Sequence, residues 1–129
     1  MVTEELLAKL EAWREADADF HRDRQLADEV LIADGWQCEP DTSFEGGIRW
    51  FWGTAPQVST SESSRPHPLI DMNAAVGVVP FRANWRIMRI GGLIRADAWF
   101  SQPLFSGESQ STCIAIVIAA LKLKRSLDK

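Results

Sequence analysis

The sequence NWRIMRIGGLIRADAWF, residues 84–100, decides the expected fold. Two stretches of alternating side chains flank Gly91-Gly92, and glycine supplies the positive φ that a two-residue hairpin turn needs. We therefore predict two antiparallel strands, 84–90 and 93–100. The turn sets which residues lie opposite each other: Ile90 and Leu93, Met88 and Arg95, Arg86 and Asp97.

Because side chains alternate along a strand, this hairpin has two different faces. The expected core face carries Trp85, Ile87, Ile94, Ala96, Ala98 and Phe100. The opposite face carries Arg86, Met88, Arg95, Asp97 and Trp99. Arg and Trp are enriched at interaction hot spots. We therefore predict a binding surface on this second face, formed by Arg86, Met88, Arg95 and Trp99.

Apolar residues at helical spacing predict helices before and after the hairpin. The first two are expected over 3–16, capped by Thr3, and over 22–34, ended by Gly35. A short helix is expected from Met72 to Val79. The last helix starts at Ser111 or Thr112, runs to about 126, and is apolar almost all round, so it should be buried against the Trp85 face of the sheet.

The remaining segments complete the expected architecture. Gly46-Gly47 opens a predicted strand at 48–54, which should extend the sheet of the hairpin. Polar, Pro- and Ser-rich segments predict loops over 55–70 and 102–109. We expect one α/β domain over 1–129: a layered α/β/α sandwich with a small antiparallel sheet, built on hairpin 84–100, between the N-terminal helices (1–36) and a buried C-terminal helix.

Charge is distributed unevenly along the chain. Residues 1–45 carry thirteen acidic and four basic residues, a net charge of −9, whereas residues 46–129 carry five acidic and ten basic residues, a net charge of +5. Such asymmetry bears on partners rather than on fold. We predict that Glu11, Glu15, Asp19 and Asp23 form an acidic counterpart to the Arg/Trp face, in a homodimer or toward a host or phage protein. The alternative is an ordinary solvated helix surface.

The chain shows no recognisable catalytic motif. His21 and His67 lie in different segments without metal-ligand spacing, and there is no G-x-S-x-G or phosphate-binding glycine motif. We therefore expect no metal, no cofactor and no enzymatic activity. The alternative function for the Arg/Trp face is binding of single-stranded nucleic acid or a small ligand, because basic and aromatic side chains on a sheet can stack on bases.

Cys38 and Cys113 are the only cysteines. No secretory signal is evident at the acidic, amphipathic N-terminus, so two free buried thiols are favoured over the disulfide that a secreted protein would allow. No apolar run is long enough to span a bilayer. We expect a cytoplasmic protein of a bacterial host cell with no membrane partner.

The order of several motifs resembles the phage ABA sandwich domain family over about 22–125. Arg24-Gln25-Leu26-Ala27-Asp28 through Gly35-Trp36 is similar to one family element, and the capped segment from Asp71 to Pro80 to a second. The tryptophan-bearing hairpin and the closing helix Ser111 to Leu121 follow in the same order. The aromatic strand 48–54 and the long serine loop depart from the family pattern.

The resemblance implies an α/β/α fold and a phage or prophage origin, and it brings no catalytic residues. Together with the charge pattern it suggests an accessory protein that acts by protein contact. Inhibition of a host defence system is the more specific hypothesis, motivated by this origin and by the acidic half of the chain.

Overall fold

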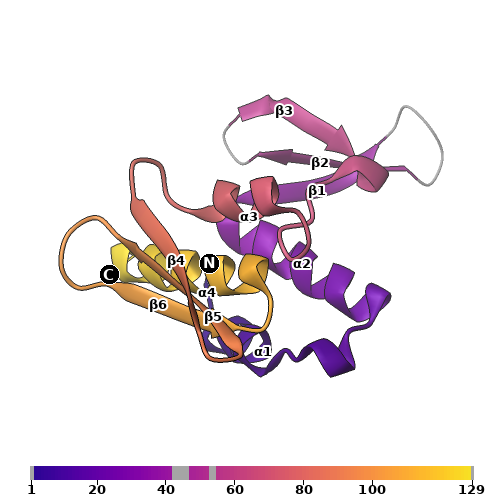
Figure 1. The fold of residues 1–129 in the computed structure, drawn as a ribbon. Coiled ribbons are helices and arrows are strands. Elements are labelled where there is room, and N and C mark those ends of the chain that lie inside the picture. The colour runs from indigo at the N-terminus through magenta and orange to yellow at the C-terminus, as the bar shows by residue number, and fades with distance from the viewer. Residues whose placement is uncertain (1, 42–46, 53–54, 129) are drawn as a thin grey trace.

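The computed structural model of this protein describes residues 2–41, 47–52 and 55–128. Within these residues, four α-helices and two three-stranded antiparallel sheets form a mixed α/β fold (Figure 1). The helices are α1 (Glu4–Ala12), α2 (Phe20–Asp34), α3 (Met72–Val78) and α4 (Thr112–Leu127). The strands are β1 (Trp36–Asp41), β2 (Gly47–Trp52), β3 (Ala55–Ser61), β4 (Asn84–Ile90), β5 (Leu93–Trp99) and β6 (Phe105–Ser109). The predicted α/β class is confirmed.

The hairpin predicted over 84–100 is present with the predicted register. β4 pairs with β5 so that Arg86 lies opposite Asp97 and Ile90 opposite Leu93. Gly91 adopts a φ of +62°, which L side chains rarely take. Strand β6 pairs with the other side of β5, so the loop prediction for 102–109 is wrong over 105–109. Its Gly and Ser residues have low β propensity, and pairing with β5 overrides that preference.

Helix α4 packs on one face of this sheet. Every residue from Cys113 through Leu121 is buried, as the apolar run predicts. Gly107 allows the close approach of β6 to this helix, because a Cβ at that position would lie 2.5 Å from the backbone oxygen of Ala115 and 2.6 Å from Cβ of Ile118. The helix contacts β5 and β6 on one side and α1, α2 and α3 on others.

The sandwich of helical and sheet layers is therefore present, with α4 rather than the sheet as its central layer (Figure 1). A helix that is apolar around its whole circumference needs cover on all sides. The sheet covers one side of α4, and the three other helices cover the rest. This arrangement leaves the second face of the sheet, the Arg/Trp face, uncovered by α4.

The predicted core face of the hairpin is only partly buried. Ala96 and Ala98 on the central strand β5 are 2% and 1% exposed, whereas Trp85 and Ile87 on the outer strand β4 are 39% and 43% exposed. Helix α4 makes its main contacts with β5 and β6. The expectation that it covers the Trp85 side chain is therefore wrong, because β4 extends beyond the helix.

Strands β1, β2 and β3 form a separate sheet. The prediction that strand 48–54 extends the sheet of the hairpin is wrong, because β2 pairs with β1 and β3 instead. The predicted loop 55–70 contains β3, an edge strand that is held by backbone pairing and needs no apolar period. Gly46 and residues 53–54 lie outside the described residues.

Strand β1 was not predicted from the sequence. Pro40 lies within it, and proline cannot donate to a strand ladder. The order β1-β2-β3 explains how the strand tolerates this residue. β1 pairs with β2 alone among the described strands, and an edge strand accommodates proline on its unpaired side.

The N-terminal helices begin at the capping residues typical of helix starts. The Thr3 hydroxyl accepts the Leu6 N–H at 3.1 Å, and Asp19 accepts the Arg22 N–H at 2.9 Å, so α2 starts slightly before the predicted residue 22. Gly35 ends α2 with a φ of +114°. Helix α1 ends at Ala12, earlier than predicted.

A partly buried ion-pair cluster joins α2 to the segment that follows β3. The Asp28 carboxylate lies 2.9 Å from Nη2 of Arg24 and 2.8 Å from Nε of Arg65. Arg24 also donates to the Pro66 carbonyl at 2.8 Å. The Arg65 guanidinium lies 5.5 Å from the ring centroid of Trp50 on β2. One carboxylate thus ties the second sheet to the helical body.

The two cysteines are free thiols, but only one is buried. Burial, with a smaller effect of the Asp71 carboxylate, raises the pKa of Cys113 at the start of α4. Cys38 is exposed on β1, so the prediction that both thiols are buried is wrong for this residue. Its edge strand extends away from the core around α4.

Candidate functional site

The Arg/Trp face of the hairpin is built around one buried carboxylate. Asp97 is fully buried, although it points away from α4. Arg86 Nε lies 2.9 Å from Asp97 Oδ2, and Arg95 Nε lies 3.1 Å from Oδ1. The Ser106 hydroxyl donates to Oδ1 at 2.6 Å and accepts from Arg95 Nη2 at 3.2 Å. Both carboxylate oxygens are therefore satisfied by neighbouring strands.

The Asp97 carboxylate is held in its ionised form. Burial by itself raises the pKa of this group, but hydrogen bonds from Ser106, Arg86 and Arg95 together outweigh it, so the pKa lies below its ordinary value. A charged Asp97 in turn fixes the position of both arginine side chains at neutral pH.

The two arginines remain open to solvent while they hold Asp97. Their side chains are 52% exposed at Arg86 and 36% exposed at Arg95. The Arg86 guanidinium lies 5.4 Å from the ring centroid of Trp99, which is partly buried. Met88 lies directly opposite Arg95 in the register and is partly buried. The structure thus brings all four predicted basic and apolar site residues onto one surface.

The charges on this surface are close to balanced. Glu108 on β6 is exposed and lies opposite Arg95 on β5, and opposite residues share a face. Two guanidiniums therefore stand beside two carboxylates, Asp97 and Glu108. The surface is polar and aromatic rather than strongly cationic.

The four predicted acidic residues do not form one uniformly acidic surface. Glu11 lies 3.7 Å from Lys122 Nζ, whereas Glu15 is exposed and its backbone N–H donates to Gln110. Asp19 caps α2, and Asp23 accepts the Trp13 indole N–H at 3.1 Å. Two of the four acids thus have clear structural partners within the N-terminal helices.

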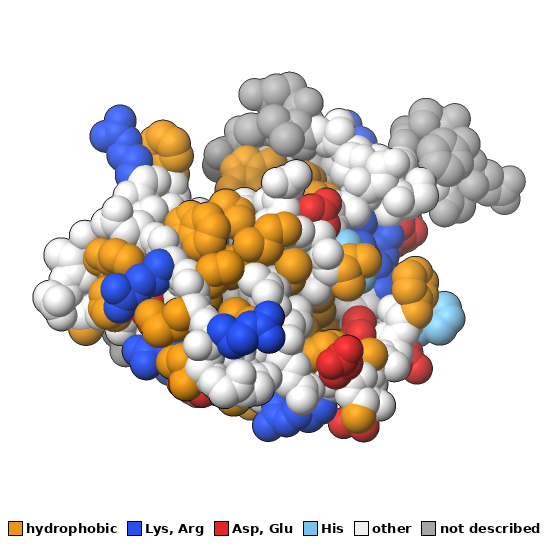
Figure 2. All heavy atoms as spheres, in the orientation of Figure 1, with side chains coloured by type: hydrophobic (Ala, Val, Ile, Leu, Met, Phe, Trp, Pro, Cys, Tyr) orange, Lys and Arg blue, Asp and Glu red, His pale blue; other side chains and the backbone are white. Residues whose placement is uncertain are grey.

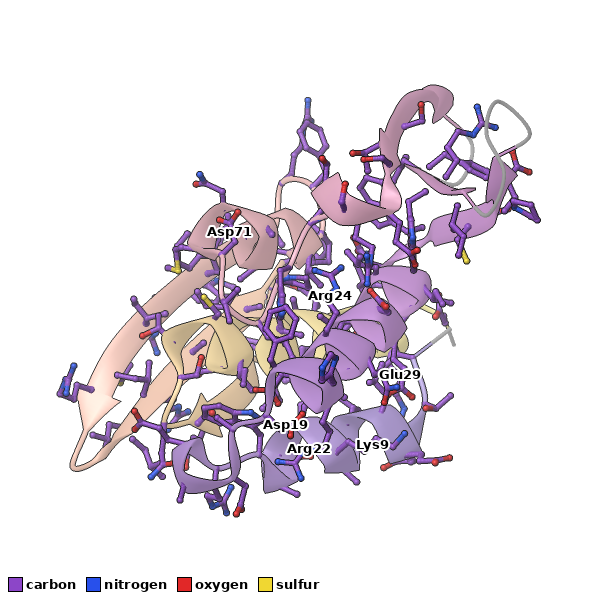
Figure 3. All side chains as sticks on the ribbon, turned by 90° about the vertical axis from the view of Figure 1, so that its right-hand side faces the viewer. Lys9, Asp19, Arg22, Arg24, Glu29 and Asp71 are labelled. Atoms are coloured by element: carbon purple, nitrogen blue, oxygen red, sulfur yellow. The ribbon has the colours of Figure 1, made fainter. Side chains whose placement is uncertain are left out.

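Basic side chains also lie among these acids. Figure 3 shows Asp19 and Arg22 at the start of α2, and Lys9 on the neighbouring α1. Lys9 Nζ lies 3.0 Å from Glu29 Oε1, and a hydrogen bond to this carboxylate raises the Lys9 pKa. The net charge of the N-terminal segment is therefore partly neutralised locally.

A cleft of about 380 Å³ opens between α1 and α2. Its lining combines one indole with charges of both signs, from Lys9, Trp13, Arg22, Asp23 and Glu29 among others. The volume lies in the range of small-molecule sites. The cleft contains Asp23 but none of the hairpin residues predicted for ligand binding.

Ser106, like Glu108, is a residue of this surface that the sequence did not identify. It lies in a segment predicted as loop and becomes a partner of Asp97 only because β6 pairs with β5. The strand could have been recognised from Phe105 and Gly107, which alternate with the polar residues Ser106 and Glu108. Glycine and serine have low strand propensity, however, and this weakens the pattern. The opposition of Arg86 and Asp97, by contrast, followed directly from the hairpin turn.

Within residues 2–41, 47–52 and 55–128, no three His, Cys, Asp or Glu side chains converge as metal ligands. No helix in the same ranges has both the length and the apolar character needed to cross a bilayer. Comparison of the chain with protein-family models, with curated proteins and with solved structures found no match. The phage-family resemblance therefore stays a prediction.

Proposed function

We propose that this protein acts by binding another protein through the Arg/Trp face of the hairpin. Asp97 anchors Arg86 and Arg95 from below while their outer N–H groups remain exposed. Side chains that are already fixed lose less conformational freedom on binding. This anchored pair of exposed guanidiniums next to Trp99 is the observation that supports the proposal most strongly.

The charge balance of the surface favours a protein over a nucleic acid. Binding of a polyanion depends on several uncompensated cations that neutralise phosphates. Here Asp97 and Glu108 offset Arg86 and Arg95. A protein partner that offers carboxylates for the guanidiniums and an apolar patch for Met88 and Trp99 fits this composition better.

The resemblance to the phage family suggests which kind of protein the partner is. A phage or prophage accessory protein would bind a host or phage protein, and inhibition of a host defence system is one such role. A homodimer that joins the acidic and basic surfaces has less support, because Asp19 and Asp23 are engaged within the N-terminal helices.

The test uses a variant that weakens partner binding without unfolding the protein. Reversing the charge of Arg86 would place a carboxylate beside buried Asp97, so we choose the double variant R86K/R95K. Lysine keeps the positive charge but lacks the planar, forked donor group. The matched control R49K/R82K makes the same change at arginines that lie outside the hairpin.

Each variant is used to capture proteins from a bacterial lysate, which are quantified by mass spectrometry. We expect a partner that the parent and R49K/R82K recover equally and that R86K/R95K recovers about tenfold less, a loss of about 1.4 kcal/mol. Equal recovery by R86K/R95K, or no recovery above background by the parent, would contradict the proposal. Tight binding of a labelled single-stranded oligonucleotide, weakening steeply with salt, would support the alternative function.

A further inference from the structure

Strand β4 has an outer edge that no other described strand covers. The sheet order is β4-β5-β6, so β4 pairs on one side only (Figure 1). A two-residue turn is closed by a hydrogen-bonded pair, here Ile90 with Leu93. Because backbone groups alternate along an antiparallel strand, Trp85, Ile87 and Arg89 direct their N–H and C=O groups to the outer edge.

The side chains along this edge are also incompletely covered. Trp85 and Ile87 belong to the α4 side of the sheet, yet they are 39% and 43% exposed. Figure 2 shows hydrophobic side chains gathered over β4 and α3. An open backbone edge beside exposed apolar side chains is a template for strand pairing.

The charges that usually protect such an edge are only partly available here. Charged side chains on an edge strand oppose pairing with another chain. Of the two arginines on β4, Arg86 is already ion-paired with Asp97 on the opposite face of the sheet. Arg89 alone points to the same side as Trp85 and Ile87.

We propose that β4 pairs with β4 of a second copy of this chain, antiparallel about a two-fold axis at Ile87. Ile87 then lies opposite Ile87 of the second copy, and these residues form a hydrogen-bonded pair. Trp85 lies opposite Arg89 of the second copy, and Arg86 lies opposite Met88. The outward N–H and C=O groups of Trp85, Ile87 and Arg89 are all paired in this register.

The side chains in this register favour a second copy as the partner. No arginine lies directly opposite another arginine, so like-charge repulsion between opposed pairs is avoided. Each Arg89 instead faces the indole of Trp85, which attracts a guanidinium. The two exposed Ile87 side chains cover each other, and the two three-stranded sheets join into one continuous sheet.

The pairing uses the backbone edge of β4 and the side chains of Trp85, Ile87 and Arg89, and it meets the Arg/Trp face only where Arg86 lies opposite Met88 of the second copy. Arg95 and Trp99 lie on β5, away from the outer edge of β4. A monomer could therefore still bind a partner through the Arg/Trp face, and a dimer could form without such a partner. The two proposals fail in different experiments.

Disulfide trapping tests the register directly. All variants carry Cys38→Ser, which removes the exposed thiol. Cα atoms of a hydrogen-bonded pair lie about 5.5 Å apart, within the range of about 4.4–6.8 Å that a disulfide spans. The full-length Ile87→Cys variant should therefore form a covalent dimer with oxidised glutathione, seen on a non-reducing gel.

Ile90→Cys is the matched control, since Ile90 is 51% exposed on the same strand. In the proposed register the two Ile90 positions lie about 20 Å apart, so this variant should stay monomeric. Equal trapping at both positions, or trapping only at Ile90, would overturn the register.

Sedimentation of the Cys38→Ser parent tests the association itself. We expect a dimer that forms with rising concentration and is lost in Ile87→Lys, which places two like charges on the axis. Ile32→Lys makes the same change at a residue on α2 that is 51% exposed, and it should leave the dimer intact. A dimer with a millimolar dissociation constant would be detected at a protein concentration of about 1 mM. A parent protein that is still monomeric at this concentration would overturn the proposal.

Discussion

Among single residues, Asp97 matters most for the stability of the hairpin sheet and for the position of Arg86 and Arg95. Its carboxylate is fully buried and is paired with two arginines and one hydroxyl. The alternation of side chains places it on the face away from α4, where an aspartate would normally be solvated. Because the carboxylate is fully buried, its ion pairs differ from ordinary surface pairs.

We predict that Asp97→Asn destabilises the protein by about 1–3 kcal/mol at pH 7, because Arg86 and Arg95 lose their shared partner. Urea unfolding measures this loss. Glu108→Gln is the control, since that carboxylate is exposed and opposite Arg95, and it should change the unfolding free energy by less than about 1 kcal/mol.

The same variant reveals a dependence on pH. The pKa of Asp97 in the folded state lies below its ordinary value of 3.8, so the ionised group adds stability above that pH. This contribution is lost as the pH falls through the lowered pKa. The stability difference between parent and Asp97→Asn should therefore shrink in strong acid, and a difference that grows there would contradict the assignment.

At the scale of elements, the contact between β6 and α4 depends on a missing side chain. A Cβ at Gly107 would lie too close to the Ala115 carbonyl and the Ile118 side chain. The sheet therefore sits closer to α4 than an alanine at this position would permit.

We predict that Gly107→Ala lowers the unfolding free energy by about 1–3 kcal/mol through overpacking. Gly92→Ala is the matched control, because a Cβ at Gly92 would meet nothing within 4 Å and only Gly35 and Gly91 have positive φ among the described glycines. Calorimetry should show a lower Tm for the first variant only. A lower Tm for Gly92→Ala alone would show that the turn, rather than the helix contact, limits stability.

At the scale of the whole molecule, two separate sheets are attached to one set of helices. The sheet β4-β5-β6 rests on α4, whereas β1-β2-β3 is joined to α2 through Asp28, Arg24 and Arg65. Both arginine side chains are largely buried, at 16% and 13% exposed. Their pairing with Asp28 therefore matters more than a surface ion pair.

We predict that Asp28→Ala loosens the second sheet by about 1–3 kcal/mol, less than the loss at a fully buried pair, because the cluster retains some solvent contact. Hydrogen exchange should accelerate in β1 and β2 while β5 stays protected. Glu29→Ala removes an exposed carboxylate from the same helix and should leave exchange unchanged. Equal acceleration in β5 would show that the two sheets unfold as one unit.

The features that depend on near neighbours along the chain could be predicted from the amino-acid sequence. The Gly-Gly turn specified the hairpin register and hence the approach of Arg86 to Asp97. Capping residues and apolar spacing located α2, α3 and α4, with their ends correct to within a few residues. The unbroken apolar run of the last helix indicated that it would be buried.

The contacts between segments far apart in the chain could not be predicted in this way. The β2 residues were recognisable as a strand, but propensity does not reveal which strands pair, and their partners are β1 and β3. Ser106 reached Asp97 through the pairing of β6 with β5. The exposure of Trp85 follows from where α4 lies across the sheet. The alternation of residues along a strand predicts which side chains share a face of the sheet. Whether that face is buried depends on contacts with segments far apart in the sequence.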